Sequence, residues 1–152
     1  MNQLSDLAYS IWVDYLEKSS DTDPAKIGSW IFSNVGRFNV YTNSKFSIVN
    51  NTFSPEIGNE EAAIFAQMYL IKYYDMLCRR ALRGLLSSDG ESTTNINWIS
   101  AKDDNSSFTR ANPNETAKVF SSAKKDAQEA LDGLLRNYIF YNATPTQIAG
   151  DE

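Results

Sequence analysis

The segment "NEEAAIFAQMYLIKYYDMLCRRALRGLL", residues 59–86, decides the fold class of this chain. Its apolar and aromatic residues recur at helical spacing on nearly every side, which is typical of a central helix that neighbours contact all round. Asn59 or Ser54 can cap this helix, and Glu60 and Glu61 suit the positive end of the helix dipole. The segment therefore predicts a long central helix.

Two further helices are predicted before this segment. Residues 4–16 place apolar side chains at the i, i+3, i+4 spacing of an amphipathic helix. Asp23 offers an N-cap and Pro24 a first helical residue, so a second helix begins there and is expected to end near Gly36. Residues 38–53 are rich in Asn, Ser, Thr and β-branched residues, which favours irregular or short extended structure.

The last predicted helix begins with a capping box, in which Asn112 is the cap, Pro113 the first helical residue and Glu115 reaches back. Its expected apolar stripe consists of Val119, Phe120, Ala123, Ala127, Ala130, Leu131, Leu134 and Tyr138. The sequence thus predicts an all-α fold, a small bundle of about four helices with long loops. We expect one helical domain, residues 1–142, followed by an extended C-terminal tail, residues 143–152.

Composition narrows the class of protein. The 152 residues are 42% hydrophobic and 22% charged, which fits one globular domain. The net charge of −5 argues against a protein that wraps DNA or RNA by neutralising phosphates. The chain contains no His, which removes the Ser-His-Asp and Cys-His nucleophile pairs and the His-based zinc sites. An enzyme is therefore not expected, and no cofactor is predicted.

Cysteine use and hydropathy bear on the compartment. The single Cys78 has no intramolecular partner for a disulfide, and no stretch has the pattern of a secretory leader, which indicates a reducing interior. No apolar stretch approaches the length of about 20 residues that crosses a bilayer, so no membrane partner is expected. Cys78 lies among apolar residues and is interpreted as a buried, inert thiol without a base.

Two clusters invite a functional interpretation beside a structural one. Arg79, Arg80 and Arg83 could bind phosphate or a partner's carboxylates, although complementing the helix dipole is the favoured explanation. Asp103 and Asp104 could be metal ligands, but their spacing lacks the alternating acids and fixed glycine of a calcium loop. A solvated loop is favoured there, and no metal site is predicted.

The run "YLIKYYD", residues 69–75, places aromatic rings beside a lysine and could stack on single-stranded bases. Helical spacing directs its tyrosines to two sides, so core packing together with a subunit contact is favoured. Tyr73 is therefore a candidate for the subunit interface.

Three blocks together resemble a known family: "IGSWIFSNVGRFN", "EEAAIFAQMYLIKYYDMLCRRAL", and "DDNSSFTRANPNETAKVFSSAKKDAQEALDGLLRNY" followed by "ATPTQIAGDE". Their order is similar to that of the small helical head-to-tail connector proteins of tailed bacteriophages, also called adaptor, head-completion or neck proteins. The resemblance spans about residues 20–150 and excludes the first twenty. Its motifs are structural rather than catalytic.

The resemblance implies a structural virion protein. Its subunits form a ring, commonly twelve-fold, between the portal protein and the tail or next neck protein, and DNA passes through without being bound. The expected location is the neck of the virion, assembled in the cytoplasm of the host bacterium. The polar stretch 100–112 and the tail 144–152 would be arms that contact neighbours. The interface residues expected on this basis are Tyr73, Arg79, Arg80, Arg83, Asp103, Asp104, Phe108, Arg110, Thr144, Pro145, Gln147 and Ile148.

Two other classes stay open. One is a non-catalytic helical regulatory or inhibitor protein that acts as a monomer or dimer. The other, ranked third, is a metal-dependent hydrolase that uses Asp103, Asp104 and a helical Glu.

Overall fold

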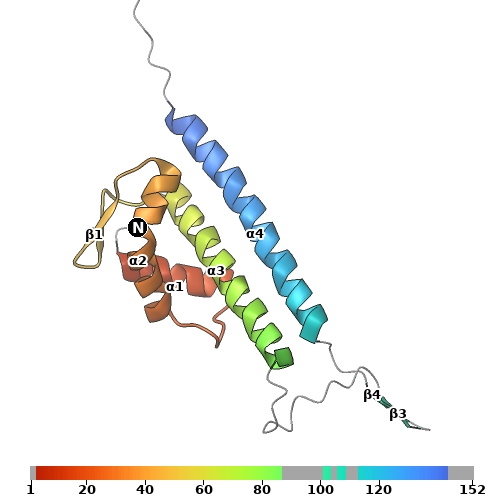
Figure 1. Cartoon of the computed structure of the whole chain (residues 1–152). Helices are drawn as coiled ribbons and strands as arrows, with labels where there is room; N and C mark the ends of the chain where they lie inside the picture. The colour runs from red at the N-terminus through yellow and green to blue at the C-terminus, as the bar shows by residue number, and fades with distance from the viewer. Residues whose placement is uncertain (1–2, 87–100, 104–105, 109–112, 144–152) are drawn as a thin grey trace, which may run out of the picture. The chain divides into compact units, whose positions relative to one another are not determined.

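The computed structural model describes residues 3–86, 101–103, 106–108 and 113–143, with side chains described for 3–83 and 115–143 (Figure 1). These residues form helices and two small hairpins, so the all-α prediction is confirmed. The elements are α1 (Leu4–Ser10), the π-helical turn η1 (Ile11–Tyr15), α2 (Pro24–Thr42), β1 (Ser47–Val49), β2 (Thr52–Ser54), α3 (Asn59–Leu86), β3 (Ala101–Asp103), β4 (Ser106–Phe108) and α4 (Pro113–Asn142).

The chain divides into two compact units, each of which contains part of α3 and part of α4. The first unit comprises Met1–Tyr69 and Glu129–Glu152. The second unit comprises Leu70–Gln128. The predicted boundary between domain and tail at residue 142 coincides with the last residue of α4.

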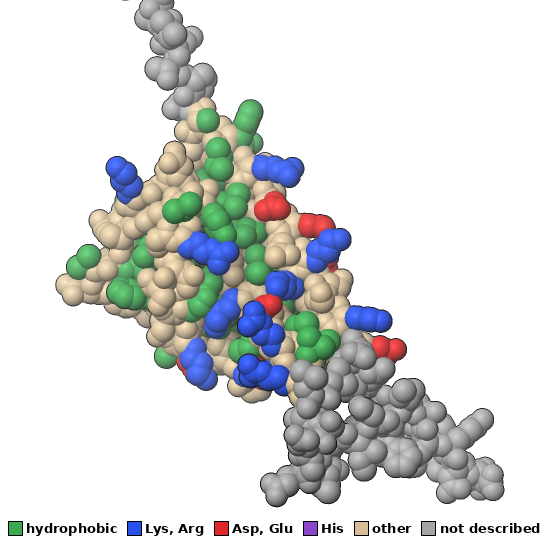
Figure 2. Space-filling model, viewed as in Figure 1, with side chains coloured by type: hydrophobic (Ala, Val, Ile, Leu, Met, Phe, Trp, Pro, Cys, Tyr) green, Lys and Arg blue, Asp and Glu red, His purple; other side chains and the backbone are tan. Residues whose placement is uncertain are grey.

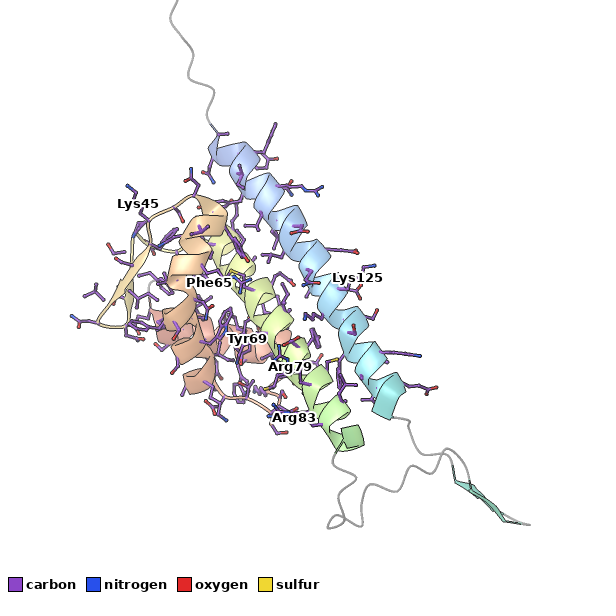
Figure 3. The ribbon with its side chains drawn as sticks, viewed as in Figure 1. Lys45, Phe65, Tyr69, Arg79, Arg83 and Lys125 are labelled. Atoms are coloured by element: carbon purple, nitrogen blue, oxygen red, sulfur yellow. The ribbon has the colours of Figure 1, made fainter. Side chains whose placement is uncertain are left out.

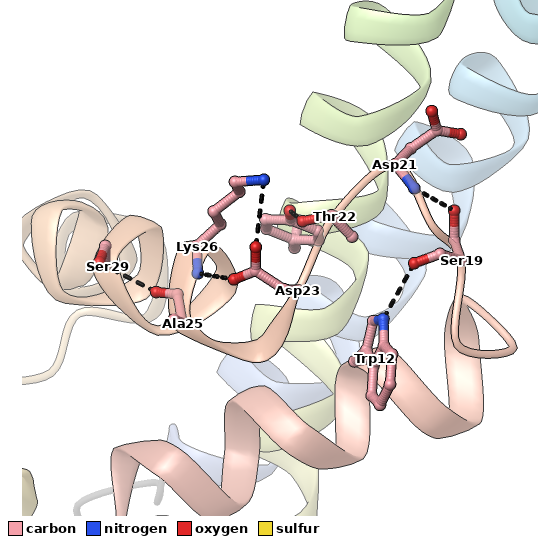
Figure 4. A network of polar contacts seen from close by, with 9 residues as sticks. Trp12, Ser19, Asp21, Thr22, Asp23, Ala25, Lys26 and Ser29 are labelled. Atoms are coloured by element: carbon pink, nitrogen blue, oxygen red, sulfur yellow. Dashed lines mark hydrogen bonds and ion pairs between the residues drawn. The ribbon is translucent and has the colours of Figure 1, made fainter.

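The first predicted helix, residues 4–16, is not a regular α-helix. Its α-helical part ends at Ser10 and a π-helical turn follows, after which Glu17 and Lys18 take positive φ values of 48° and 58°. The Trp12 indole N–H donates to the backbone carbonyl oxygen of Ser19 at 3.1 Å and holds the turn against the helix (Figure 4). No local pattern predicts that turn, because its partner lies outside the helix.

The predicted start of α2 is confirmed and the predicted end is wrong. Asp23 caps the helix, since its Oδ1 accepts from the backbone N–H of Lys26 at 2.8 Å and its Oδ2 lies 3.1 Å from Lys26 Nζ (Figure 4). The helix continues through Gly36 to Thr42, where Asn43 at φ 51° closes it. An exposed glycine costs a helix only about 1 kcal/mol, which burial of Phe38 two residues later offsets.

Residues 38–53 are therefore helical up to Thr42 and partly extended beyond. Strands β1 and β2 pair antiparallel, with Ile48 opposite Phe53. The turn between them consists of Asn50 and Asn51, both at positive φ (50° and 63°), a conformation that asparagine tolerates. The carbonyl oxygen of Asn51 accepts from the Leu4 N–H at 2.9 Å, so the hairpin also closes the start of α1.

Aromatic rings form the centre of the first unit. Phe38 and Phe65 stack with centroids 4.0 Å apart and planes 3° apart, and Phe46 meets Phe38 edge-on at 5.6 Å. Tyr69 is 1% exposed, and its hydroxyl forms a 2.8 Å hydrogen bond with the buried Thr22 hydroxyl. The amino-terminal half of α3 is thus buried among elements from distant parts of the sequence, as expected for a central helix.

Within each unit, α3 and α4 run antiparallel. In the first unit, Glu61 Oε1 accepts from the Tyr138 hydroxyl at 2.8 Å, while Oε2 accepts from the Gly58 N–H at 3.0 Å. In the second unit, Lys124 Nζ lies 2.6 Å from Asp75 Oδ1.

The predicted stripe of α4 is only partly correct. Ala127, Leu131 and Tyr138 are buried, but Val119 is 65% exposed and Ala130 is exposed. Ala117, which the prediction left out, is buried. The inner positions recur every seven residues at 117, 124, 131 and 138, a pattern that the lysine at position 124 disguises.

A change of Tyr138 to Phe should weaken the first unit at neutral pH, and its difference from the unaltered chain should shrink at alkaline pH. Burial, together with the hydrogen bond to Glu61, raises the pKa of Tyr138 to about 12 from 10.0. The folded state therefore holds this proton more tightly than the unfolded chain, and the stability involved is complete below pH 10 and lost as pH rises toward 12.

We expect Tyr138→Phe to lower the free energy of unfolding by about 1 kcal/mol at neutral pH and to flatten its alkaline decline. Urea unfolding between pH 8 and about 12 measures both effects. Tyr141→Phe is the matched control, because the Tyr141 side chain is 75% exposed. An alkaline decline as steep in Tyr138→Phe as in the unaltered chain would contradict the assignment.

Candidate functional site

The predicted arginine cluster lies on the C-terminal half of α3. Arg79, Arg80 and Arg83 are all exposed, and Figure 3 labels Arg79 and Arg83. Arg79 Nε lies 2.8 Å from Asp75 Oδ2, one helical turn earlier. The cluster is therefore a surface feature of the second unit.

Asp75 connects this cluster to α4. Its carboxylate is held by Lys124 on one oxygen and by Arg79 on the other. The hydrogen bond from Lys124, with the positive charge of Arg79 in addition, holds the pKa of Asp75 below its usual value of 3.8. Asp75 stays ionised at neutral pH and brings two cations from different helices together.

Tyr73 is buried, with 8% of its surface exposed, and its ring packs edge-on against Tyr74 at 5.6 Å. It belongs to the interior of the second unit. Its predicted role in core packing is confirmed, whereas a subunit contact made by this side chain stays a prediction.

The other predicted interface residues lie mostly outside the described residues. Asp103 ends β3 and Phe108 ends β4, and these strands pair antiparallel with Ala101 opposite Phe108. Asp104, Arg110, Thr144, Pro145, Gln147 and Ile148 lie outside the described residues, and their roles stay predictions.

Conventional reactive groups are sparse in the described part of the chain. Among residues 3–83 and 115–143, no three His, Cys, Asp or Glu side chains come close enough to hold a metal ion. Cys78 is half-buried rather than buried, and its thiol donates to the Ala117 carbonyl oxygen at 3.6 Å. No helix in this part of the chain is both long and apolar enough to cross a membrane.

An apolar surface that the sequence interpretation missed lies at the end of α4. Ile139, Phe140 and Tyr141 are 49%, 79% and 75% exposed. These three residues are the apolar end of α4. A signal for it was present, because four consecutive large apolar residues in one helix, from Tyr138 on, cannot all face the same side.

A second apolar surface is a groove of about 510 Å³ between α1 and α2. It is lined by Leu4, Ser5, Pro24, Ala25, Gly28, Ser29, Phe32, Ser33 and Asn51. The two helices are close at Gly28, where a Cβ would stand 3.7 Å from that of Ala8, an ordinary van der Waals contact. The ring of Phe32 is 57% exposed beside this α1–α2 groove.

The comparisons with known proteins add no relative. The chain matches no protein-family model, no curated protein and no solved structure.

Proposed function

We propose that this chain is a non-catalytic structural subunit that assembles with copies of itself into a ring of the head-to-tail connector type. The observation that carries the proposal is the pair of separate apolar surfaces on the first unit, one projecting and one hollowed. The apolar end of α4 exposes two aromatic rings and an isoleucine, and the α1–α2 groove has the apolar lining to receive them. When two different surfaces of one subunit meet, the contact is heterologous and closes into a ring if the rotation allows.

The resemblance to bacteriophage connectors supplies the context of the proposal. In that context the ring lies between the portal protein and the tail in the virion neck, and it completes the head. DNA passes through its channel and is not specifically bound. The arms at 100–112 and 144–152 are proposed to contact the portal protein and the next neck protein.

Exposure of large apolar side chains supports an assembly function over that of a lone monomer. A single exposed apolar residue is ordinary, but three consecutive ones on a helix end are typical of an interaction surface. Burial of one Phe side chain contributes about 1.5–3 kcal/mol, so Phe140 alone can change an association constant by about ten-fold or more.

Phe140→Ser is therefore expected to weaken self-association by about ten-fold or more while leaving the helix content unchanged. Sedimentation velocity over a range of protein concentrations measures the association, and electron microscopy shows whether rings form. Val40→Ser is the matched control, because Val40 is 78% exposed on α2 and outside both surfaces. If both variants and the unaltered chain associate equally, the apolar end of α4 is not part of the interface. If the unaltered chain stays monomeric at every concentration, the proposed assembly function is wrong.

A further inference from the structure

Charge is segregated between the two units. Among the side chains described in the second unit, seven Lys and Arg stand against three Asp and Glu. In the first unit, ten Asp and Glu stand against five Lys and Arg. Among the described side chains, the second unit is therefore net basic and the first unit net acidic.

The cations of the second unit gather on one surface (Figure 2). Lys72, Arg79 and Arg83 follow one another on α3 at spacings of seven and four residues, so they share one side of the helix. Lys118 and Lys125 are seven residues apart on α4, and Lys124 joins the two helices through Asp75. These six residues are the basic face.

The acids of the first unit are concentrated near its start. From Asp6 to Asp21, four acids stand against Lys18 alone. Leu4, Leu7, Ala8 and Ile11 are buried and mark the inner side of α1, whereas Asp6, Tyr9, Asp14 and Glu17 are exposed. These four exposed residues are the acidic face.

The π-helical turn contributes to this arrangement. In a regular α-helix, residues eight apart differ by about 80° around the axis. The wider turn of η1 reduces that difference, so Asp14 comes to the same side as Asp6. A turn type that interrupts the helix thus aligns two acids on its outer side.

From these observations we infer that the basic face of one copy binds the acidic face of a second copy. The inference rests on the proposed function and specifies which surfaces meet in the ring. The two faces have opposite charge and lie on the surface. Tyr9 lies between the acids in the sequence and is 53% exposed, and its ring can stack on an arginine guanidinium whose charge the carboxylates pair with. The chain already uses this pairing, because Arg37 lies 5.2 Å over the ring of Tyr41.

A polyanion such as duplex DNA is the competing occupant of the basic face. The observations favour a second copy for two reasons. The acidic first unit would repel the phosphates of DNA, and it supplies a surface whose charge is complementary to the basic face. Contacts between exposed charges set the partner and the register more than the affinity, which suits a ring whose apolar contacts hold it together.

Charge reversal and re-pairing test the inference. One variant reverses the basic face, Arg83→Glu with Lys118→Glu, and another reverses the acidic face, Asp6→Lys with Asp14→Lys. Neither pair of positions lines the α1–α2 groove or the apolar end of α4. We expect each variant alone to associate about ten-fold more weakly than the unaltered chain, and an equimolar mixture of the two to regain association. Association of the unaltered chain should weaken when NaCl rises from about 0.05 M to about 0.5 M.

Lys45→Glu is the control for a general effect of charge, since Lys45 is exposed outside both faces (Figure 3). Circular dichroism confirms that every variant is folded. If both reversed variants associate as the unaltered chain does, the proposed charged contact is wrong, whereas the proposed ring is not contradicted. If the mixture does not regain association, the two faces do not pair. The unaltered chain could instead bind a duplex oligonucleotide in a salt-sensitive way. If Arg83→Glu with Lys118→Glu abolishes that binding and leaves self-association unchanged, the basic face is a phosphate-binding surface.

Discussion

Phe65→Ala is expected to lower the free energy of unfolding by about 3–5 kcal/mol, which is a large part of the stability of a domain of this size. The Phe65 ring is fully buried, lies parallel to Phe38 at 4.0 Å and meets Phe53 at 6.0 Å. Removing it opens a cavity between α2, α3 and the β1–β2 hairpin, which the rigid helices cannot close. Urea unfolding followed by circular dichroism measures the change.

Phe32→Ala is the control for Phe65→Ala, because Phe32 is 57% exposed on α2. It should change the free energy of unfolding by no more than about 0.5 kcal/mol when the protein is dilute enough to be monomeric. Phe65→Leu should fall between the two, since it keeps part of the buried volume. Equal losses for the exposed and the buried phenylalanine would mean that the stacked pair does not centre the core.

Tyr73→Glu is expected to be at least as disruptive at neutral pH, and its effect should depend on pH. Tyr73 is 8% exposed, so the substitution places a carboxylate in a largely apolar interior at a cost of several kcal/mol. Burial raises the pKa of such a carboxyl above that of the unfolded chain. The folded variant then binds the proton more tightly, so its stability is highest below about pH 4 and is lost as pH rises through the folded pKa.

Melting temperatures of Tyr73→Glu relative to the unaltered chain at about pH 4 and pH 7 measure this dependence. Tyr73→Phe keeps the ring and should be mild, and Tyr15→Glu adds the same charge at a side chain that is 41% exposed. Any loss of assembly by Tyr73→Glu would follow from damage to the interior. A stable Tyr73→Glu chain that fails only to assemble would instead place the tyrosine at the subunit contact.

The fold was predictable from the sequence where the controlling interaction is local. Asp23 and Pro24 start α2, and the hydrogen bond that the Lys26 N–H donates to the Asp23 carboxylate depends only on that segment. The end of α2 was misplaced because a glycine such as Gly36 ends a helix only where tertiary packing does not stabilise the residues that follow it. Asn39, whose side-chain amide bonds both backbone groups of Phe46 at 2.8 Å, holds the chain after the true end.

The candidate site was predictable only in pieces. The arginines of α3 are neighbours in the sequence and were recognised together. Lys118 and Lys124 lie about forty residues further along the chain. In the structure Lys124 forms an ion pair with Asp75, and helical spacing, which relates residues of one helix, does not predict such a contact between two helices. The apolar end of α4 was overlooked for another reason: the predicted stripe ended at Tyr138, and the three apolar residues after it were assigned to no surface.

The hydrogen bond from the Leu4 N–H to Asn51 has a consequence for the order of folding. A helix of seven residues such as α1 does not persist alone in water, because nucleation costs more than so few bonds return. Its first turn is completed by the hairpin turn, which also binds Ser5 across 46 residues of chain. We therefore expect α1 to form only after Asn50 and Asn51 have made their turn, and to pack late onto α2 and the hairpin.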